Sequence, residues 1–411
     1  MKIKDIVTFV SKSITPQEGV IYNLYSLPSF DEGKTFEVLD GGDIQSNKYD
    51  VPNKCILFNK LNVRFKRVWR IENQDDNKIS STEFLPLVVN ENVVDFQYCY
   101  YLLISDKITN YLCGQNTNTS GSHKRIDTNN FLNIEINLPK MSIQKQIGKT
   151  LSVLDRKIEL NKQINDNLEA MAKQLYDYWF VQFDFPNEDD KPYKSSGGAM
   201  VWNDKLKREI PQGWNTVVIG DILDKYPATK RYETKEYLPQ GNYPIVDQGD
   251  SYIVGFTNER ENLLVRHPAV LFGDHSTKVK FLDFDFARGA DGTQILYSSI
   301  PEVSQYYLYL ALKSMSIPNP GYSRHFKYLK EMPIIAPSID VAKAFSEIVT
   351  PLFKQWTNNV FGNIVLTKQR DELLPLLING QASVNYHLSV FYAKHNQLYL
   401  CLKNSLLCPI H

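Results

Sequence analysis

Residues 143–179 read "IQKQIGKTLSVLDRKIELNKQINDNLEAMAKQLYDYW", and their apolar residues recur at alternating intervals of four and three. This spacing is the heptad signature of a helix that buries a narrow stripe against a partner helix. The stripe consists of Ile147, Leu151, Leu154, Ile158, Asn161, Asn165, Leu168, Ala172, Leu175 and Trp179. Two asparagines therefore lie in the middle of an apolar seam. The spacing predicts one helix over 143–179, about 55 Å long at about 1.5 Å per residue.

The same stripe recurs 198 residues later, with both asparagines at corresponding positions. It consists there of Phe345, Val349, Leu352, Trp356, Asn359, Asn363, Leu366, Arg370, Leu373 and Leu377. A second helix is therefore predicted over 341–377, ending at Pro375 because proline interrupts helices.

Three shorter stretches also recur in the same order. "IKDI" from Ile3 matches "IGDI" from Ile219, "CILF" from Cys55 matches "AVLF" from Ala269, and "QYCYYLL" from Gln97 matches "QYYLYLA" from Gln305. Ordered matches of this kind indicate a duplicated unit. Each copy is predicted to be a β-rich variable domain followed by one long helix. The predicted fold class is α+β, with two such domains joined by two long antiparallel coiled-coil helices in a pseudo-twofold internal repeat.

The asparagines are predicted to set the register of the helix pair. In an antiparallel pair related by a pseudo-twofold axis the helix midpoints face each other, and these midpoints are Asn161 and Asn359. The two amides are expected to hydrogen-bond across the seam, with Asn165 and Asn363 one turn away. The alternative is that the asparagines lie at a widened, hydrated part of the seam.

The overall composition restricts the class of protein. The 411 residues, 43% hydrophobic and 22% charged, are typical of a globular protein with at least two domains. Lys plus Arg equals Asp plus Glu at 46 each, so a nucleic-acid function requires local basic patches. Five cysteines without a CxxC spacing argue against a disulfide framework or a zinc site and suggest the cytoplasm. Neither a signal peptide nor a membrane-spanning segment is recognisable.

One basic patch lies between Lys54 and Arg70, where six Lys or Arg alternate with aromatic residues and no acid occurs. Its candidate DNA contacts are Arg64, Lys66 and Arg67. In an extended "VRFK", Val63 and Phe65 would pack on one side while Arg64 and Lys66 face phosphates on the other. The alternative is a strand edge that charge protects from pairing.

Two loops that precede the long helices provide further candidates. They are "TSGSHKRI" (119–126) and "GYSRHFKYL" (321–329), which combine glycine, hydroxyl groups, histidine and basic side chains suited to phosphates and base edges. The candidate residues are Ser122, His123, Lys124, Arg125, Tyr322, Ser323, Arg324, His325 and Lys327. "GDHSTKVK" (273–280) adds Lys278 and Lys280 on one face of a predicted strand. Ordinary polar turns are the alternative.

Sequence motifs of catalysis are missing. The chain contains no GxxxxGK[ST], GxGxxG, GxSxG or HExxH, and no [Asn/Asp]-Pro-Pro-[Phe/Tyr] of amino-methyltransferases. His267 and His275 have no further ligand at metal-binding spacing, so no metal site is predicted. The sequence predicts a protein without catalytic residues.

The pattern resembles the DNA-specificity subunits of type I restriction-modification systems. The resemblance is carried by residues 138–185, "MVWNDKLKREIPQGW" (200–214) and "LTKQRDELLPLLINGQ" (366–381). It divides the chain into a first target recognition domain (1–140), a long helix (141–180), a linker (181–210), a second target recognition domain (211–336) and a second long helix (337–380). Residues 381–411 form a tail for which neither the repeat nor the resemblance provides a role.

The resemblance implies a non-enzymatic DNA reader. Each recognition domain would read one half of a bipartite target, and the helices would set the gap and dock two methyltransferase subunits. Motor-nuclease subunits join this assembly when the DNA is cleaved, so S-adenosylmethionine and ATP would act only through partner subunits. Two other classes stay open on the residues alone, namely a coiled-coil adaptor that binds proteins without reading DNA and a stand-alone enzyme of unrecognised type.

Overall fold

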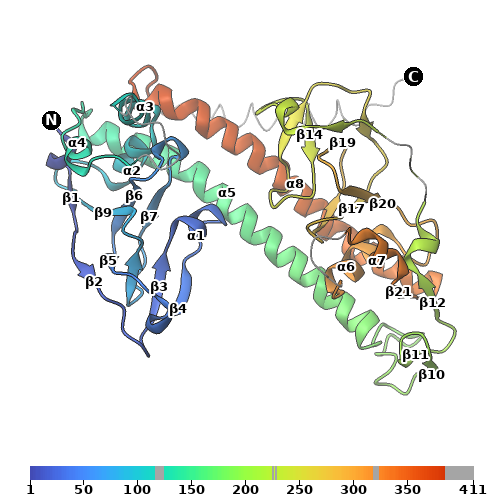
Figure 1. Cartoon of the computed structure of the whole chain (residues 1–411). Coiled ribbons are helices and arrows are strands. Elements are labelled where there is room, and N and C mark those ends of the chain that lie inside the picture. The colour runs from blue at the N-terminus through green and yellow to red at the C-terminus, as the bar shows by residue number, and fades with distance from the viewer. Residues whose placement is uncertain (116–124, 225, 227–228, 318–323, 385–411) are drawn as a thin grey trace. The chain divides into compact units, whose positions relative to one another are not determined.

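The computed structural model describes residues 1–115, 125–224, 226, 229–317 and 324–384 of the chain (Figure 1). Two compact units are present. Unit 1 is built from two separate stretches of the sequence and unit 2 from one continuous stretch. Unit 1 comprises residues 1–158 together with the chain from Val365 onward, and unit 2 comprises residues 159–364. Two long helices, α5 (Met141–Tyr176) and α8 (Ile339–Ile378), each contribute residues to both units.

Unit 1 contains two sheets within its described residues. The first has the order β1-β9-β6-β7 and the second the order β2-β5-β8-β3-β4. The strands are β1 (Val7–Phe9), β2 (Ser13–Ile14), β3 (Ile21–Tyr25), β4 (Glu37–Asp40), β5 (Lys48–Asp50), β6 (Cys55–Asn59), β7 (Val68–Ile71), β8 (Lys78–Ser80) and β9 (Phe84–Val89). The short helices are α1 (Leu27–Asp31), α2 (Phe96–Ile104), α3 (Asp106–Gln115) and α4 (Thr128–Leu132).

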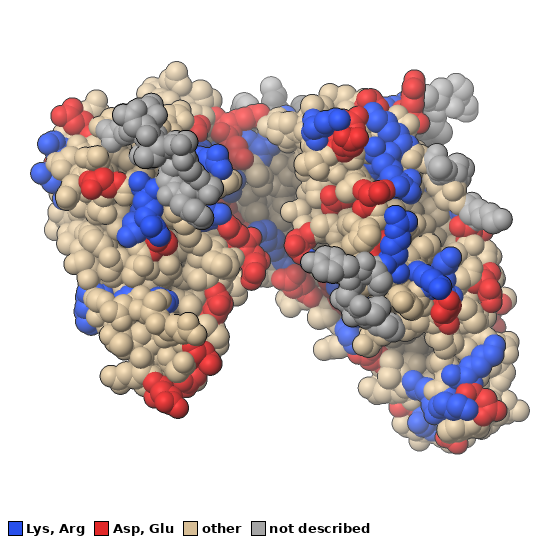
Figure 2. Space-filling view, in the orientation of Figure 1, with Lys and Arg blue, Asp and Glu red and all other residues tan. Residues whose placement is uncertain are grey.

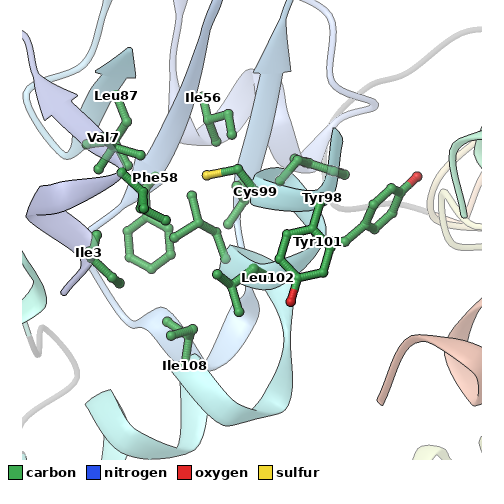
Figure 3. Close-up of a cluster of buried hydrophobic side chains, with 14 of the residues drawn as sticks. Ile3, Val7, Ile56, Phe58, Leu87, Tyr98, Cys99, Tyr101, Leu102 and Ile108 are labelled. Carbon is green, nitrogen blue, oxygen red and sulfur yellow. The ribbon is translucent and has the colours of Figure 1, made fainter. Parts of the chain in front are cut away.

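The main core of unit 1 lies between the first sheet and helix α2. Figure 3 shows Cys99 and Leu102 of α2 beside Ile56 and Phe58 of β6. Asp95 is the N-cap residue of helix α2, and its carboxylate accepts a hydrogen bond from the Tyr98 amide at 2.9 Å. Because both faces of β6 are buried, "CILF" forms a continuous apolar strand without alternation.

Unit 2 is also a mixture of short sheets and helices. Its described sheets have the orders β10-β11, β12-β21, β18-β17-β20 and β13-β19-β14-β15, with β16 also paired to β19. The strands are β10 (Met200–Asn203), β11 (Arg208–Pro211), β12 (Asn215–Val218), β13 (Arg231–Tyr232), β14 (Tyr243–Val246), β15 (Gly255–Thr257), β16 (Leu263–Leu264), β17 (Ala269–Gly273), β18 (Val279–Leu282), β19 (Phe286–Gly289), β20 (Thr293–Leu296) and β21 (Pro333–Ala336). The short helices are α6 (Gln305–Ser314) and α7 (Phe326–Glu331).

The repeated stretches of sequence form the same elements in both units. "CILF" and "AVLF" lie in the buried strands β6 and β17, and the two tyrosine-rich stretches form helices α2 and α6. "IKDI" and "IGDI" both form single 3-10 turns, in which Ile3 and Ile219 are fully buried. The structure therefore contains the internal repeat that the sequence predicts.

The apolar residues of the stripe do not all face a partner helix. Ile147 and Leu151 of α5 belong to the core of unit 1, where they join residues of α2 and the sheet as well as Leu374 and Leu377 of α8. The corresponding Phe345 and Val349 of α8 belong to the core of unit 2. Leu154, Ile158, Ala172 and Trp179 are also buried, whereas the other stripe residues outside the asparagines are partly exposed, namely Leu168, Leu175, Leu352, Trp356, Leu366, Arg370 and Leu373.

The asparagines meet in a different register from the predicted one. Asn161 donates to Asn363 at 2.8 Å, and Asn359 donates to Asn165 at 2.9 Å. The predicted pairing of Asn161 with Asn359 is therefore wrong by one helical turn. The observed register lets all four amides pair with one another, whereas the predicted one would have paired only two in this way, and buried amides that lack partners are costly.

The two asparagine pairs also follow the internal repeat. The 198-residue offset converts Asn161 into Asn359 and Asn363 into Asn165, so it exchanges one pair for the other. From the first pair to the second, the residue number rises from 161 to 165 along α5 and falls from 363 to 359 along α8. The two helices are therefore antiparallel here. A pseudo-twofold axis passes between the two pairs and not through the predicted midpoints.

Pro375 does not end the second helix, which continues to Ile378. The last turn is held because Leu374 and Leu377 are buried in the core of unit 1. Gly380, two residues after the end of the helix, has a φ of +70° and turns the chain away from the helix axis. The Gly380 amide donates to the Leu377 carbonyl, and the next amide donates to the Leu376 carbonyl at 2.8 Å, as in a Schellman motif.

The segment predicted as a linker is folded. Its strands β10 and β11 pair in an antiparallel hairpin, and an aromatic cluster precedes and follows them. Phe185 stacks on Tyr193 and on Trp214 at centroid distances of 4.7 and 4.8 Å. The aromatic residues of this segment provide the apolar surface that folds it, which glycine, serine and acidic residues alone would not supply.

We expect Asn165→Leu to lower the stability of unit 2 by about 1–3 kcal/mol, because Asn359 then loses a buried hydrogen-bond partner. Adding Asn359→Leu should recover much of the loss, since neither position then carries a buried amide. Denaturant unfolding monitored on unit 2 measures both effects. Equal losses for the double variant and for the sum of the two single variants would show that the amides do not act as a pair.

Candidate nucleic-acid interface

In unit 1, two of the predicted basic stretches lie side by side. The turn between β6 and β7 contains Arg64, Lys66 and Arg67 of the first stretch, and Arg125 belongs to the second. Leu61 and Arg125 form an antiparallel β-bridge, and the Ile126 amide donates to the Lys60 carbonyl at 2.9 Å. These contacts place Arg125 on the same surface as the basic residues of the turn.

Unit 2 repeats this arrangement. The turn between β17 and β18 lies beside the start of α7, where the His325 amide donates to the Asp274 carbonyl at 2.9 Å. Asp274 lies 214 residues after Lys60, which is the offset between "CILF" and "AVLF". The Asp274 carboxylate also accepts from the Phe326 amide at 2.8 Å and so holds the first turn of α7. The two units thus present the same pair of segments.

The turns differ in length between the two copies. In unit 1 the strand pair Phe58 and Val68 encloses nine residues, 59–67. In unit 2 the corresponding pair Phe272 and Val279 encloses six, 273–278. The longer turn of unit 1 contains a 3-10 turn over Val63–Phe65, flanked by Asn62 and Lys66 with positive φ of 51° and 47°.

The extended conformation predicted for "VRFK" is therefore wrong. Val63 is buried, but Phe65 is 53% exposed, so these two side chains do not share a face. A period of two describes side chains only while the backbone is extended, and the left-handed residues on both sides reverse the chain here. The sequence contains no glycine at these positions that would have indicated such a turn.

Most basic side chains of this surface in unit 1 have acidic partners. Arg67 donates to both carboxylate oxygens of Asp31 at 2.7 and 2.6 Å. Lys66 pairs with Asp106 at 2.6 Å, and Arg125 pairs with Glu83 at 2.6 Å. Arg64 is exposed and forms no ion pair with the described residues. Its guanidinium instead lies over the ring of Phe65, 4.8 Å from the centroid.

Lys280 of unit 2 does not lie on the surface as predicted. Its side chain is buried, and its ammonium group donates to the carbonyls of Asp247 and Ser251 at 2.7 and 2.6 Å. Burial lowers the pKa of Lys280 to about 8. Strand β18 is covered on both faces, so alternation does not separate a wet side from a dry one. Lys278 is half-exposed and pairs with Asp250.

His325 is also buried, at 1% exposure, which contradicts its assignment as a DNA contact. Its backbone joins the turn after β17, so the residue acts in the fold of the surface and does not lie on it. Arg324 and Lys327 on either side are exposed, and neither pairs with a described acidic residue. The candidates Ser122, His123, Lys124, Tyr322 and Ser323 lie outside the described residues.

Several residues that organise the surface were not predicted. Asp31, at the end of α1, fixes Arg67 from a distance of 36 residues. Gln248 accepts from the His275 amide at 2.9 Å and donates to the Asp291 carbonyl at 2.7 Å, so it joins two turns of unit 2. No local sequence signal distinguishes these polar residues from exposed ones. An acidic residue that is near a basic patch in space but distant in the sequence cannot be found from the spacing of residues along the chain.

Charge is mixed over both units. On the face drawn in Figure 2, Lys and Arg are interspersed with Asp and Glu in each unit. Among the described residues there is no group of three or more His, Cys, Asp or Glu that could hold a metal ion. None of the helices in the described part of the chain is both long and apolar enough to cross a membrane.

The chain is thus a duplicated protein, in which each unit holds the same pair of segments together. The family model of the type I restriction modification DNA specificity domain matches residues 1–170 and 211–360. The chain therefore belongs to the specificity-subunit family of type I restriction-modification systems. Specificity subunits are non-catalytic components of these systems, so the prediction that the chain is not an enzyme is confirmed.

Curated relatives agree with this family. The chain is 25% identical over 334 residues to the type I restriction enzyme MjaIX specificity subunit of Methanocaldococcus jannaschii, covering 75% of this chain and 74% of that protein. It is 25% identical to the HindI specificity subunit of Haemophilus influenzae, covering 84% and 93% of the two chains.

A solved structure shares the fold. The S subunit of a type I restriction-modification system from M. genitalium superposes with a TM-score of 0.53, at 16% identity, over 92% of this chain and 95% of that one. The predicted α+β fold with an internal repeat and two long helices is confirmed.

Proposed function

We propose that this specificity subunit reads a bipartite double-stranded DNA target, with one half-site contacted by each unit. The observation that carries the proposal is the repeated pair of segments, joined by an equivalent backbone hydrogen bond in each unit. Segments of this kind offer side chains to base edges while the sheet behind them keeps their position. The two units differ in the residues that they expose there, which supports different half-sites.

The exposed basic residues of each surface are the proposed DNA contacts. They are Arg64, Lys66 and Arg125 in unit 1 and Lys278, Arg324 and Lys327 in unit 2. The sequence candidate Arg67 is only 16% exposed and is held by Asp31. Ion pairs with nearby acids orient Lys66, Arg67, Arg125 and Lys278. Lys66, Arg125 and Lys278 are expected to contact phosphates, since exposed pairs exchange readily for other anions.

The proposed assembly contains further subunits. Two methyltransferase subunits per chain are expected, because the chain contains two copies of one unit, each matched by the family model. S-adenosylmethionine and ATP would be bound by partner subunits, with motor-nuclease subunits joining when cleavage follows. The proposed location is the cytoplasm, where a bacterial or archaeal chain of this family meets its DNA.

Selection from randomised DNA tests this function. The full chain, co-expressed with its methyltransferase, is incubated with a randomised duplex library, and bound duplexes are sequenced. Recovery of two short conserved blocks separated by a spacer of constant length is expected. Recovery of unrelated sequences, together with a stable complex with the methyltransferase, would instead favour an adaptor that binds proteins without reading DNA.

We expect Arg324→Ala combined with Lys327→Ala to weaken recognition of one half-site and leave the other unchanged. Both residues are exposed in unit 2, and each lost contact to a base should cost about 1–3 kcal/mol. Binding is measured on duplexes in which one half-site at a time is altered. The exposed Lys205→Ala variant, remote in sequence from the surface, serves as a control for charge. Equal weakening on every duplex would reduce these residues to phosphate contacts.

A further inference from the structure

The β6–β7 turn is three residues longer than the β17–β18 turn, which distinguishes unit 1 from unit 2. The fold does not require this additional length, since β17 and β18 are joined by the shorter turn and keep the same strand pairing. The additional residues form the 3-10 turn that carries Arg64 and Phe65. Its flanking residues, Asn62 and Lys66, both have left-handed backbones, which is costly for residues other than glycine.

The side chains of this turn form an ordered stack. The guanidinium groups of Arg64 and Arg67 each lie 4.8 Å from the centroid of the Phe65 ring. Arg67 is in turn held by two hydrogen bonds to Asp31, and its side chain is only 16% exposed. The order of contacts is therefore Asp31, Arg67, Phe65 and Arg64. Arg67 is anchored to the unit through Asp31, Phe65 contacts Arg67, and Arg64 is the outermost.

An exposed phenylalanine is otherwise unfavourable at this position. Phe65 is 53% exposed and so leaves much of its ring in contact with water. What the ring provides is a surface on which the planar guanidinium of Arg64 can stack, an interaction that lysine does not reproduce equally. Stacking restricts the rotamers of Arg64 before DNA binds and so lowers the entropy lost on binding.

We infer that Arg64 reads a guanine in the half-site bound by unit 1, donating to its O6 and N7 atoms from the major groove. The inference rests on the proposed DNA-reading function and specifies a residue and a base for it. An arginine that donates two hydrogen bonds, one to O6 and one to N7 of guanine, makes the commonest specific contact between a side chain and a base. Phe65, Arg67 and Asp31 are positioning residues, which act by orienting Arg64.

The charge state of the stack supports this division of roles. Arg67 is compensated by Asp31, and the neighbouring Lys66 by Asp106, whereas Arg64 has no acidic partner among the described residues. Only the face of the Arg64 guanidinium rests on Phe65, so the N–H groups in its plane stay available as donors. A guanidinium bound edge-on to a base uses its N–H groups in the plane and leaves its face for stacking.

The test uses the full chain in complex with its methyltransferase and the target found by selection from randomised DNA. Each guanine of that target is replaced in turn by 7-deazaguanine, which lacks the N7 acceptor and leaves Watson–Crick pairing intact. For the wild-type chain, we expect one replacement in the half-site of unit 1 to weaken binding roughly 10- to 100-fold. For Arg64→Ala the same replacement should have no effect, and selection should no longer prefer guanine there.

Conservative variants separate base reading from charge and from folding. Arg64→Lys keeps the charge but lacks the planar fork, so it should lose most of the preference for guanine while retaining binding to other duplexes. Phe65→Ala should reduce the preference, whereas Phe65→Trp, which retains a ring for stacking, should preserve it. Lys205→Ala, at an exposed lysine outside the proposed surfaces, is the control and should leave this preference unchanged.

The outcomes distinguish failure of the inference from failure of the proposed function. If selection yields no conserved blocks with the wild-type chain, the proposed function itself is wrong. If selection yields a bipartite target but Arg64→Ala lowers binding equally on all duplexes, Arg64 contacts phosphate and the inference is overturned. The inference is also overturned if the wild type and Arg64→Ala respond equally to every 7-deazaguanine replacement.

Discussion

Insertion of seven residues into both long helices should shift the preferred DNA spacer by about three base pairs without changing the bases that are read. The insertions follow Ile158 in α5 and Ile364 in α8, where the chain passes from one unit to the other. Seven residues add about 10 Å of helix. At about 3.4 Å per base pair this corresponds to about three base pairs. Binding to the original spacer should fall at least 100-fold, as one half-site is lost.

Helical phase provides a second expectation from the same variant. One heptad rotates the following residues by only about 20°, whereas three base pairs rotate the DNA by about 100°. The new optimum should therefore bind more weakly than the wild type binds its own target. Methylation or binding is measured on duplexes with constant half-sites and a spacer varied by one base pair at a time.

Two controls accompany this variant. A seven-residue insertion into α5 alone takes the asparagine pairs out of register with the Asp155–Arg370 pair and should destabilise the helix pair instead of moving the optimum. A second control inserts glycine and serine residues beyond Gly380, where the helices are unaffected. If the paired insertions change the preferred bases and leave the spacer as before, the long helices do not set the spacing.

Replacement of Asp155 by alanine should lower the stability of unit 1 by about 2–4 kcal/mol. The Asp155 carboxylate accepts from the Tyr101 hydroxyl at 2.5 Å and from Arg370 at 3.0 Å. The side chains of Asp155 and Arg370 are 21% and 28% exposed, so the variant leaves a poorly hydrated cation and a phenol without their acceptor. Asp371 keeps two hydrogen bonds from Arg370, at 2.9 and 2.8 Å, which limits the loss.

The internal repeat shows that the fold does not need this ion pair. The residues of unit 2 that correspond to Tyr101, Asp155 and Arg370 are Tyr309, Phe353 and Ala172, by the offsets of 208 and 198. There the tyrosine ring packs on Phe353, with 5.7 Å between centroids. We therefore expect Arg370→Ala, added to Asp155→Ala, to recover part of the lost stability, since the buried cation is removed.

Denaturant unfolding and hydrogen exchange of the α2 amides measure this loss. Asp371→Ala, which removes the more exposed partner of Arg370, is the control and should change stability by less than about 1 kcal/mol. Unchanged exchange of α2 in Asp155→Ala would show that the ion pair contributes nothing to unit 1.

Much of the architecture could be predicted because its signals are local and repeated. The heptad spacing from Ile147 and its recurrence from Phe345 predict the two long helices. The buried strands "CILF" and "AVLF" follow from continuous apolar runs. The repeat adds what a single helix cannot provide, because corresponding asparagines in both copies imply an antiparallel pair with a twofold relation.

The candidate site was predicted less completely, because exposure depends on what covers a residue. Lys280 and Arg64 both lie in basic stretches, yet one is buried between two carbonyls and the other is exposed on an aromatic ring. His325 lies in a polar stretch but is covered by the turn after β17. Composition identified the segments, whereas it could not identify the side chains that they expose.

The sequence alone determined that the chain is a duplicated protein with two long helices and polar residues at their centre. Only the tertiary structure decided the partners of those residues. Asn161 pairs with Asn363 because that register satisfies four amides, and Arg67 pairs with Asp31 because α1 ends beside the β6–β7 turn. Periodicity expresses the geometry of one element. Pairing depends on which distant groups compete for the same hydrogen bonds, and this is decided when the elements pack.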